Sequence, residues 1–205
     1  MKLWLFFAAA AVELTGVALS WEPLQWVAKP LLAPLLLWHL GRFCLVGWGL
    51  VFATAGDVAL LVPGTVPFLL GMACFLGTQI CFLVAFLRHG RPRRLVALGY
   101  GILWAVLNAV LWPSLGDLRV PILVYSLALS AMAAAAWSVS PVVAAGGFLF
   151  LLSDLLIGLG AAGLGFPGRN LVVMVTYIAA LFLIVTGVLS RDGTGDRAGG
   201  RAARA

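Results

Sequence analysis

Charged residues are scarce in this chain, and their scarcity excludes a soluble fold. Only 10% of the 205 residues are Asp, Glu, Lys or Arg, whereas 63% are hydrophobic, and the mean hydropathy is +1.12. The interior of a soluble domain of this size is too small to bury so much apolar surface. The sequence therefore predicts a multi-pass protein of the cell (inner) membrane.

Histidine, cysteine and nucleophilic serine motifs are also sparse, which removes several classes of enzyme. The two histidines, His39 and His89, lie at the ends of apolar runs, so a His-rich zinc site cannot be assembled from them. The cysteines Cys44, Cys74 and Cys81 lack metal-ligand spacing and are predicted to be small core residues. No serine lies in a G-x-S-x-G motif. We expect neither a metal nor a cofactor.

The apolar runs lack the alternating polar and apolar pattern of membrane-spanning strands, so helices are favoured. Turn and charge signals divide the chain into eight runs long enough to span a bilayer. The predicted fold is an all-α integral membrane protein with eight transmembrane helices in one domain, residues 1–190. Residues 191–205 are predicted to be a disordered, basic cytoplasmic tail. The expected spans are 3–20, 24–40, 43–62, 66–88, 94–112, 121–139, 141–163 and 170–190.

Basic residues are unevenly distributed between the two sides of these spans. Only Arg119 and Arg169 fall on the side opposite the N-terminus, so the positive-inside rule predicts that both termini are cytoplasmic. The same bias explains the net charge of +6 without a nucleic-acid partner. The first span also resembles a cleavable signal peptide, although Glu13 within it and the charge bias favour a retained helix. The basic residues on the N-terminal side are Lys2, Arg42, Arg88, Arg91, Arg93, Arg94, Arg191, Arg197, Arg201 and Arg204.

Three charged residues interrupt the apolar runs. Asp57 lies in CLVGWGLVFATAGDVALLV, Asp154 in VVAAGGFLFLLSDLLIGLGAAG, and Lys29 in LQWVAKPLLAPLLLW. Each charge costs about 2.5–3.5 kcal/mol at the centre of a membrane helix, which makes such residues candidates for a functional site. Counting depth along the predicted spans places further polar residues in the outer half of the membrane or near its middle: Glu13, Gln79, Asn108, Tyr125 and Tyr177. We therefore expect one polar cavity open toward the outer face.

A purely structural role for these residues is the simplest alternative. A buried aspartate can pin a neighbouring helix, and Gln79, Asn108 or a tyrosine can serve only as a hydrogen-bond partner between helices. The charges as a group favour chemistry. Lys29 can neutralise one carboxylate, and a second unpaired carboxyl in a dry site is expected to hold a proton. One ionised and one neutral carboxyl is an arrangement suited to general acid and base catalysis.

Five segments resemble the YhhN-like lysoplasmalogenase family, which includes the vertebrate alkenyl-ether hydrolases. They are KPLLAPLL, FATAGDVALL, GMACFLGTQICFLVAF, PILVYSLALSAMAAAA and GGFLFLLSDLLIGL, and their order and spacing carry the resemblance. The chain departs from the family pattern at three positions. Gln79 stands where the family often has His, Phe82 where it has Tyr, and Ala180 where it has Gln.

The resemblance implies hydrolysis of the vinyl ether bond of a lysoplasmalogen, giving a fatty aldehyde and a glycerophospho-alcohol. Its substrate would be a lysophospholipid taken from the bilayer, with membrane lipids as the surroundings. Asp57 and Asp154 would be the acid/base pair, and the chemistry would need no metal. The substrate-binding or tuning residues would be Lys29, Glu13, Gln79, Asn108, Tyr125, Tyr177 and Ser153.

Two other readings of the same residues stay open at the level of sequence. One is a small-molecule or proton-coupled transporter that uses Lys29, Asp57 and Asp154 as a relay. The absence of an internal repeat weakens that reading, because many transporters contain such symmetry. The other is a structural multispan protein whose charges only hold helices together. The sequence does not define an oligomeric state.

Overall fold

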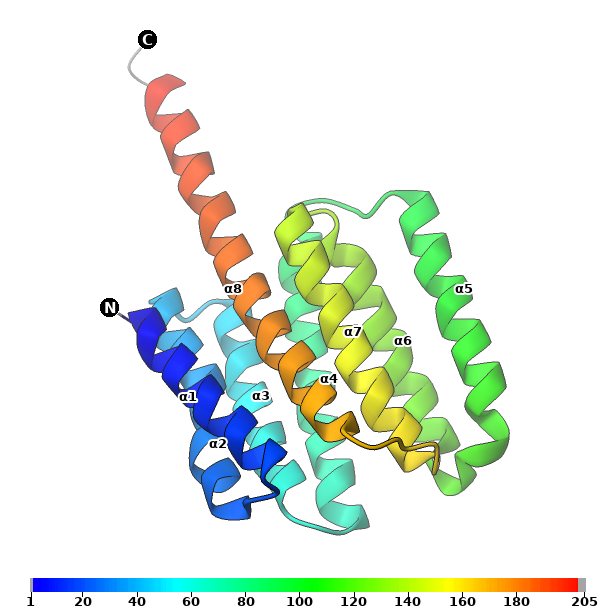
Figure 1. Ribbon diagram of the computed structural model, residues 1–205. Coiled ribbons are helices and arrows are strands. Elements are labelled where there is room, and N and C mark those ends of the chain that lie inside the picture. Colours follow the sequence, from blue (N-terminus) through cyan, green and yellow to red (C-terminus); the bar gives the residue numbers. More distant parts are fainter. Residues whose placement is uncertain (1, 203–205) are drawn as a thin grey trace.

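Eight α-helices form a bundle in the computed structural model, which describes the backbone of residues 2–202 and the side chains of residues 3–192 (Figure 1). Within that part of the chain there is no strand, so the predicted all-helical class is confirmed. Two short 3-10 helices, η1 and η2, join α5 to α6. The elements are α1 (Lys2–Ala18), α2 (Glu22–Leu40), α3 (Leu45–Leu61), α4 (Thr65–Leu87), α5 (Arg94–Leu111), η1 (Trp112–Ser114), η2 (Gly116–Leu118), α6 (Arg119–Ala136), α7 (Pro141–Ala161) and α8 (Arg169–Ala202).

Local sequence signals set several helix boundaries. Gly41 ends α2 in the left-handed conformation, with φ at 70°, and its amide donates to the carbonyl of Leu37. At the start of α7 the hydroxyl of Ser140 accepts from the amide of Val143 at 3.2 Å, and Pro141 occupies the first helical position. These breaks agree with those predicted from the sequence.

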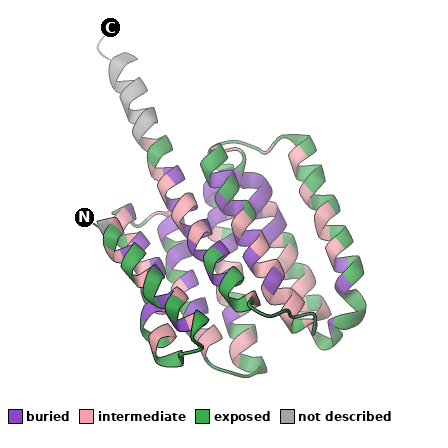
Figure 2. Ribbon diagram, in the orientation of Figure 1, coloured by how far each residue is buried: buried purple, intermediate pink, exposed green. Residues whose placement is uncertain are grey.

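Among the described residues, five helices are long and apolar enough to cross a membrane, namely α4 to α8, and α1 and α3 are shorter apolar helices. The outward side of α5 shows what such helices present to their surroundings. Leu95, Leu98, Ile102, Val106 and Val110 are all more than half exposed and recur every three or four residues (Figure 2). A continuous apolar stripe of this kind fits lipid rather than water. The chain is thus a multi-pass membrane protein, and the number of eight crossings stays a prediction.

The start of α1 and the C-terminal turns of α8 lie at the same end of the bundle, which we call the terminal end (Figure 1). The turn at Arg42 and the loop that follows α4 lie at this end, and Arg42 forms an ion pair with Asp192 of α8. The other end, called the distal end, contains the α1–α2, α3–α4 and α7–α8 connections. The α8 backbone is helical to Ala202. The predicted disordered tail, 191–205, lies mostly outside the residues with described side chains and stays a prediction.

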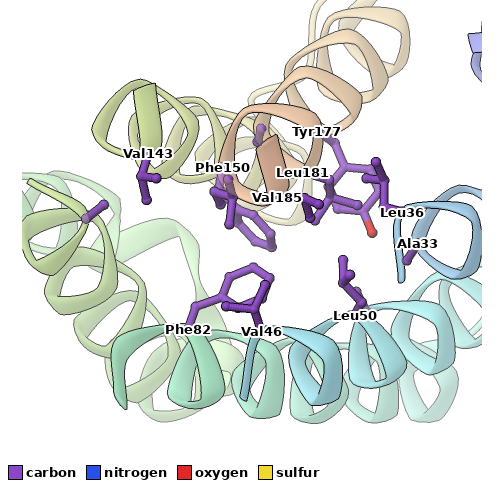
Figure 3. Packing of buried hydrophobic residues seen from close by; sticks show 14 of the residues in the cluster. Ala33, Leu36, Val46, Leu50, Phe82, Val143, Phe150, Tyr177, Leu181 and Val185 are labelled. Atoms are coloured by element: carbon purple, nitrogen blue, oxygen red, sulfur yellow. The ribbon is translucent and has the colours of Figure 1, made fainter. Parts of the chain in front are cut away.

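The apolar core runs through the terminal half and the middle of the bundle. Figure 3 shows part of it. Phe82 of α4 faces Phe150 of α7 edge-on, with ring centroids 6.4 Å apart, and both rings are fully buried. Leu50 of α3 and Leu181 of α8 complete this layer and are equally buried. The charged residues within the spans, by contrast, lie in the distal halves of their helices.

Glycines allow two helix pairs to approach closely. A Cβ at Gly146 of α7 would lie 2.8 Å from Cγ1 of Ile184 and 3.0 Å from the carbonyl oxygen of Ala180, both on α8. A Cβ at Gly56 of α3 would lie 2.7 Å from the ring of Phe75 on α4. Small residues at such contacts are a general device of membrane helix packing. The α3–α4 and α7–α8 pairs therefore depend on the missing side chain.

Replacing Gly146 with alanine is expected to destabilise the protein, because the new methyl group meets the backbone of α8, which cannot move aside as a side chain can. Overpacking of this kind costs about 1–3 kcal/mol. Gly99→Ala in α5 is a matched control, since a Cβ there has no neighbour within 4 Å and alanine favours the helix. Thermal unfolding in detergent should show a lower midpoint for Gly146→Ala only. Equal midpoints would contradict the close α7–α8 contact.

Candidate active site

Asp57 lies in the distal half of α3 and is almost completely buried, with 1% of its surface exposed. The hydroxyl of Tyr177, from α8, donates a hydrogen bond of 2.7 Å to its Oδ2 atom. Tyr177 is itself buried, so this bond joins α3 to α8 in a water-poor environment. Two of the predicted site residues, 120 positions apart in the chain, are thus direct partners.

Asp154 lies on α7 and receives two hydrogen bonds at the same oxygen, Oδ2. One comes from Nε2 of Gln79, on α4, at 3.2 Å, and the other from the hydroxyl of Tyr125, on α6. Gln79 is fully buried, whereas Asp154 and Tyr125 are half-buried. The second predicted carboxyl therefore has its own set of donors, supplied by two further helices.

Lys29 and Glu13 complete the charged group from the α1–α2 side. Lys29 interacts electrostatically with both Glu13 and Asp57, but among residues 3–192 it makes no ion pair within 4 Å. Glu13 is fully buried, and neither of its carboxyl oxygens has a hydrogen-bond partner. An unpartnered buried carboxylate is costly, and Lys29 is the cation placed to offset part of that cost. The structure shows no contact pair for Lys29 among these residues, and the expected neutralisation by Lys29 stays a prediction.

The remaining predicted residues link helices around this group. Asn108 donates to the carbonyl of Trp104 at 2.9 Å and to the hydroxyl of Ser126 at 3.1 Å, which ties α5 to α6. The hydroxyl of Ser153 donates to the carbonyl of Val173 on α8 at 3.0 Å. Ser153 is therefore directed at α8.

An apolar cavity of about 90 Å³ lies beside Asp154, between α4, α5, α6 and α7. Its polar lining includes Asp154, Tyr125 and Asn108, and the rest is almost entirely hydrocarbon. Phe75 also lines it and packs edge-on against Tyr177, with ring centroids 5.8 Å apart. Asp154 thus borders the cavity, whereas Asp57 does not. The apolar lining includes Met72, Phe75, Leu107, Ile122, Leu129 and Leu151.

A larger polar hollow of about 790 Å³ opens at the distal end of the bundle. It shares Leu60, Phe68 and Ile157 with the wall of the apolar cavity, so the two spaces adjoin. Its polar lining consists mainly of Ser20, Glu22, Gln25, Lys29, Arg169 and Asn170.

The sequence predicted one polar cavity around all the polar residues of the spans. In the structure Asp154, Tyr125 and Asn108 line the apolar cavity and Lys29 lines the polar hollow. The other predicted residues line neither of these two spaces, namely Glu13, Asp57, Gln79 and Tyr177.

The residues that the prediction missed are Gln25, Arg169 and Asn170, which line the hollow, and Trp104 and Ser126, which line the cavity. Arg169 was assigned only to the charge bias between the two sides. Its position as one of two basic residues on that side was the signal that could have identified it.

Comparison with known proteins found relatives and a matching family model. Two proteins named lysoplasmalogenase, from Mycobacterium bovis and Mycobacterium tuberculosis, are each 33% identical to this chain over 150 residues. The matched region covers 67% of this chain and 58% of each relative, so the chain spans little more than half the length of the relatives it matches. No solved structure matches it. The family model that matches is the YhhN family, over residues 24–188, and the chain therefore belongs to the YhhN family.

Proposed function

We propose that this chain is an intramembrane hydrolase that cleaves the vinyl ether bond of lysoplasmalogens. The products would be a fatty aldehyde and a glycerophospho-alcohol. The observation that carries the proposal is Asp154, a carboxyl held by two donors at the border of an otherwise apolar cavity. The name of the mycobacterial relatives, lysoplasmalogenase, and the YhhN family match support the proposal that the vinyl ether bond is the one cleaved.

The proposal includes an orientation in the inner cell membrane. Residues 1–190 would cross the bilayer eight times as one hydrolase domain, with both termini and the basic tail in the cytoplasm. Two features support this: the start of α1 and the C-terminal turns of α8 share one end of the bundle, and the arginine-rich loop after α4 lies at that end (Figure 1). The polar hollow would then open on the outer face, and a lysophospholipid of the outer leaflet could place its headgroup there.

The first chemical step would be transfer of a proton from Asp154 to the β-carbon of the vinyl ether. The double bond supplies the electron pair for the new C–H bond, and the carbon attached to oxygen becomes an oxocarbenium ion. Asp154 becomes a carboxylate in this step. The hydrogen bonds from Gln79 and Tyr125 to its Oδ2 atom would stabilise that new charge.

The later steps would consume one water molecule. Water adds to the oxocarbenium carbon and gives a proton back to a carboxylate, forming a hemiacetal. The hemiacetal then breaks its C–O bond: the leaving oxygen takes up a proton, and the remaining hydroxyl loses one as the aldehyde forms. Each proton taken from a carboxyl is returned to one, so the site ends the cycle as it began.

The two aspartates would differ in their resting state. Lys29 is the cation that acts on Asp57, whereas Asp154 borders the apolar cavity, which Lys29 does not line. We assign Asp154 as the neutral acid and Asp57 as the carboxylate that offsets the cationic intermediate. Tyr177 would hold Asp57 in place through its hydrogen bond. The chemistry would be metal-free, since the steps need only a proton donor and a carboxylate.

A transporter that uses the same charges is not favoured. Transport needs a polar route through both halves of the bundle, but fully buried aromatic rings pack between the helices on the terminal side of Gln79 and Asp154. Phe82 and Phe150 face each other there (Figure 3).

Asp154→Asn and Asp57→Asn are each expected to reduce aldehyde release from a lysoplasmenyl lipid by about 10²–10⁴-fold, the usual contribution of a general acid or base. Asparagine keeps the size of the side chain but cannot transfer the proton. Asp117→Asn is the matched control, because Asp117 is an exposed aspartate of η2 at the same end of the bundle. The assay follows aldehyde release by the purified protein in detergent. Full activity in both test variants would refute the carboxyl chemistry.

Infrared difference spectroscopy can test the assignment of the two resting states. The parent protein at neutral pH should show the C=O stretch of a neutral carboxyl that shifts when the solvent is changed to D₂O. Asp154→Asn should remove one such band, whereas Asp57→Asn should leave it in place. Glu13→Gln, measured alongside, identifies any band that belongs to the third buried carboxyl. A band lost in Asp57→Asn and kept in Asp154→Asn would reverse the assignment.

A further inference from the structure

The polar hollow at the distal end has no part in the proton transfers described above. Its walls come mainly from α2, α7 and α8, with the end of α3, the start of α4 and the turn before α2, and it adjoins the apolar cavity at Leu60, Phe68 and Ile157. A molecule that extends from one space into the other would therefore meet a hydrocarbon environment, then Asp154, and then a set of polar groups. The side chains that line the hollow indicate which polar group of such a molecule would bind there.

Two cations line the hollow, Lys29 and Arg169. Neither forms an ion pair within 4 Å in the part of the chain with described side chains. The guanidinium of Arg169 donates to the carbonyl of Leu156 at 3.3 Å and to the side-chain oxygen of Asn170 at 3.1 Å. A guanidinium has more donors than these two bonds use, so Arg169 retains N–H groups for a ligand.

The position of Arg169 is defined by the helix beside it. Its guanidinium lies where a Cβ of residue 160 would be, and residue 160 is a glycine. The absence of that side chain lets Arg169 lie across the last turn of α7, where the Leu156 carbonyl holds it. A half-buried arginine fixed in this way loses less freedom on binding an anion than an extended surface arginine does.

We propose that the polar hollow binds the phosphate of a lysophospholipid headgroup, with Arg169 and Lys29 as its ligands. Arginine and lysine are the side chains suited to phosphate oxygens, arginine by paired hydrogen bonds and lysine as a point charge. Glu22, two turns before Lys29 on α2, lines the same hollow and is the acceptor for the ammonium of a zwitterionic headgroup. This inference rests on the proposed function, because it extends the same lipid from the apolar cavity into the hollow.

The decisive measurement is the binding of lipids that cannot be cleaved. A saturated alkyl-ether lysophosphoethanolamine and the matching alkylglycerol differ by the phosphate-containing headgroup and contain no vinyl ether. The purified protein should bind the phosphorylated lipid at least about tenfold more tightly, as expected for charge-assisted hydrogen bonds. Arg169→Gln should remove most of that preference, and Arg169→Lys should keep part of it. Lys29→Gln should also reduce it.

Arg119→Gln is the matched control. Arg119 is also at the distal end, but it donates to the carbonyl of Trp112 at 2.8 Å, stacks on that indole and does not line the hollow. The Arg119→Gln variant should prefer the phosphorylated lipid as strongly as the parent protein does. Gly160→Ala should weaken the preference without removing a charge, because the new methyl group displaces the guanidinium.

Glu22→Gln tests the ammonium contact separately. The parent should bind the ethanolamine lipid more tightly than the corresponding lysophosphoglycerol, whose headgroup has a phosphate but no ammonium. The Glu22→Gln variant should lose that difference in affinity. The difference is expected to be about tenfold or less, since Glu22 is exposed to solvent. A difference unchanged in Glu22→Gln would remove Glu22 from the subsite.

Other outcomes would overturn the headgroup assignment. Equal affinity of the parent for the phosphorylated lipid and the alkylglycerol would do so. A second outcome would assign the hollow to a free anion: inorganic phosphate protects the parent protein, but not Arg169→Gln, from thermal unfolding, and the parent shows no preference for the phosphorylated lipid. A preserved lipid preference together with no aldehyde release from a lysoplasmenyl lipid would instead refute the proposed reaction while leaving the phosphate subsite in place.

Discussion

A carboxyl group buried among hydrocarbon has to be supplied with hydrogen-bond donors by its neighbours, and this need organises the distal half of the bundle. Asp57 on α3 takes its donor from Tyr177 on α8, and Asp154 on α7 takes its donors from α4 and α6. Five of the eight helices are therefore held in position by two aspartates. The same bonds that satisfy the carboxyls also fix where each one points, so packing and site geometry have a common origin.

The glycine before Asp57 connects the apolar packing to this polar group. Gly56 allows the ring of Phe75 to lie against α3, and Phe75 in turn packs on Tyr177 and lines the apolar cavity. One short sequence, Gly56-Asp57, thus provides a close helix contact and a carboxyl within a single turn. A bulkier residue at position 56 would move Phe75, and through it the tyrosine that holds Asp57.

Local signals made the helices predictable, whereas the partners within the site depended on tertiary packing. Gly41 and Ser140 mark helix ends by backbone and capping chemistry, which a sequence displays directly. Depth counting correctly grouped Asp57 with Tyr177 in one half of the bundle. Depth counting could not predict the hydrogen bond between them. That bond depends on how α8 packs in the folded bundle, and the two residues are 120 positions apart in the chain. Gln79 illustrates the same limit: it was recognised as a departure from the family pattern, and only the structure places its amide against Asp154.

The lengths of the helices also have a consequence for the surrounding bilayer. α1 and α3, which pack on α2 and contain Glu13 and Asp57, have 17 residues each and rise about 25 Å, short of the roughly 30 Å of hydrocarbon in a bilayer. Hydrophobic mismatch of this sign is relieved by local thinning of the lipid. In the proposed arrangement of eight spans, the water boundary should therefore dip toward the protein on the α1–α3 side, so that a deeply placed carboxyl lies only a short distance from solvent.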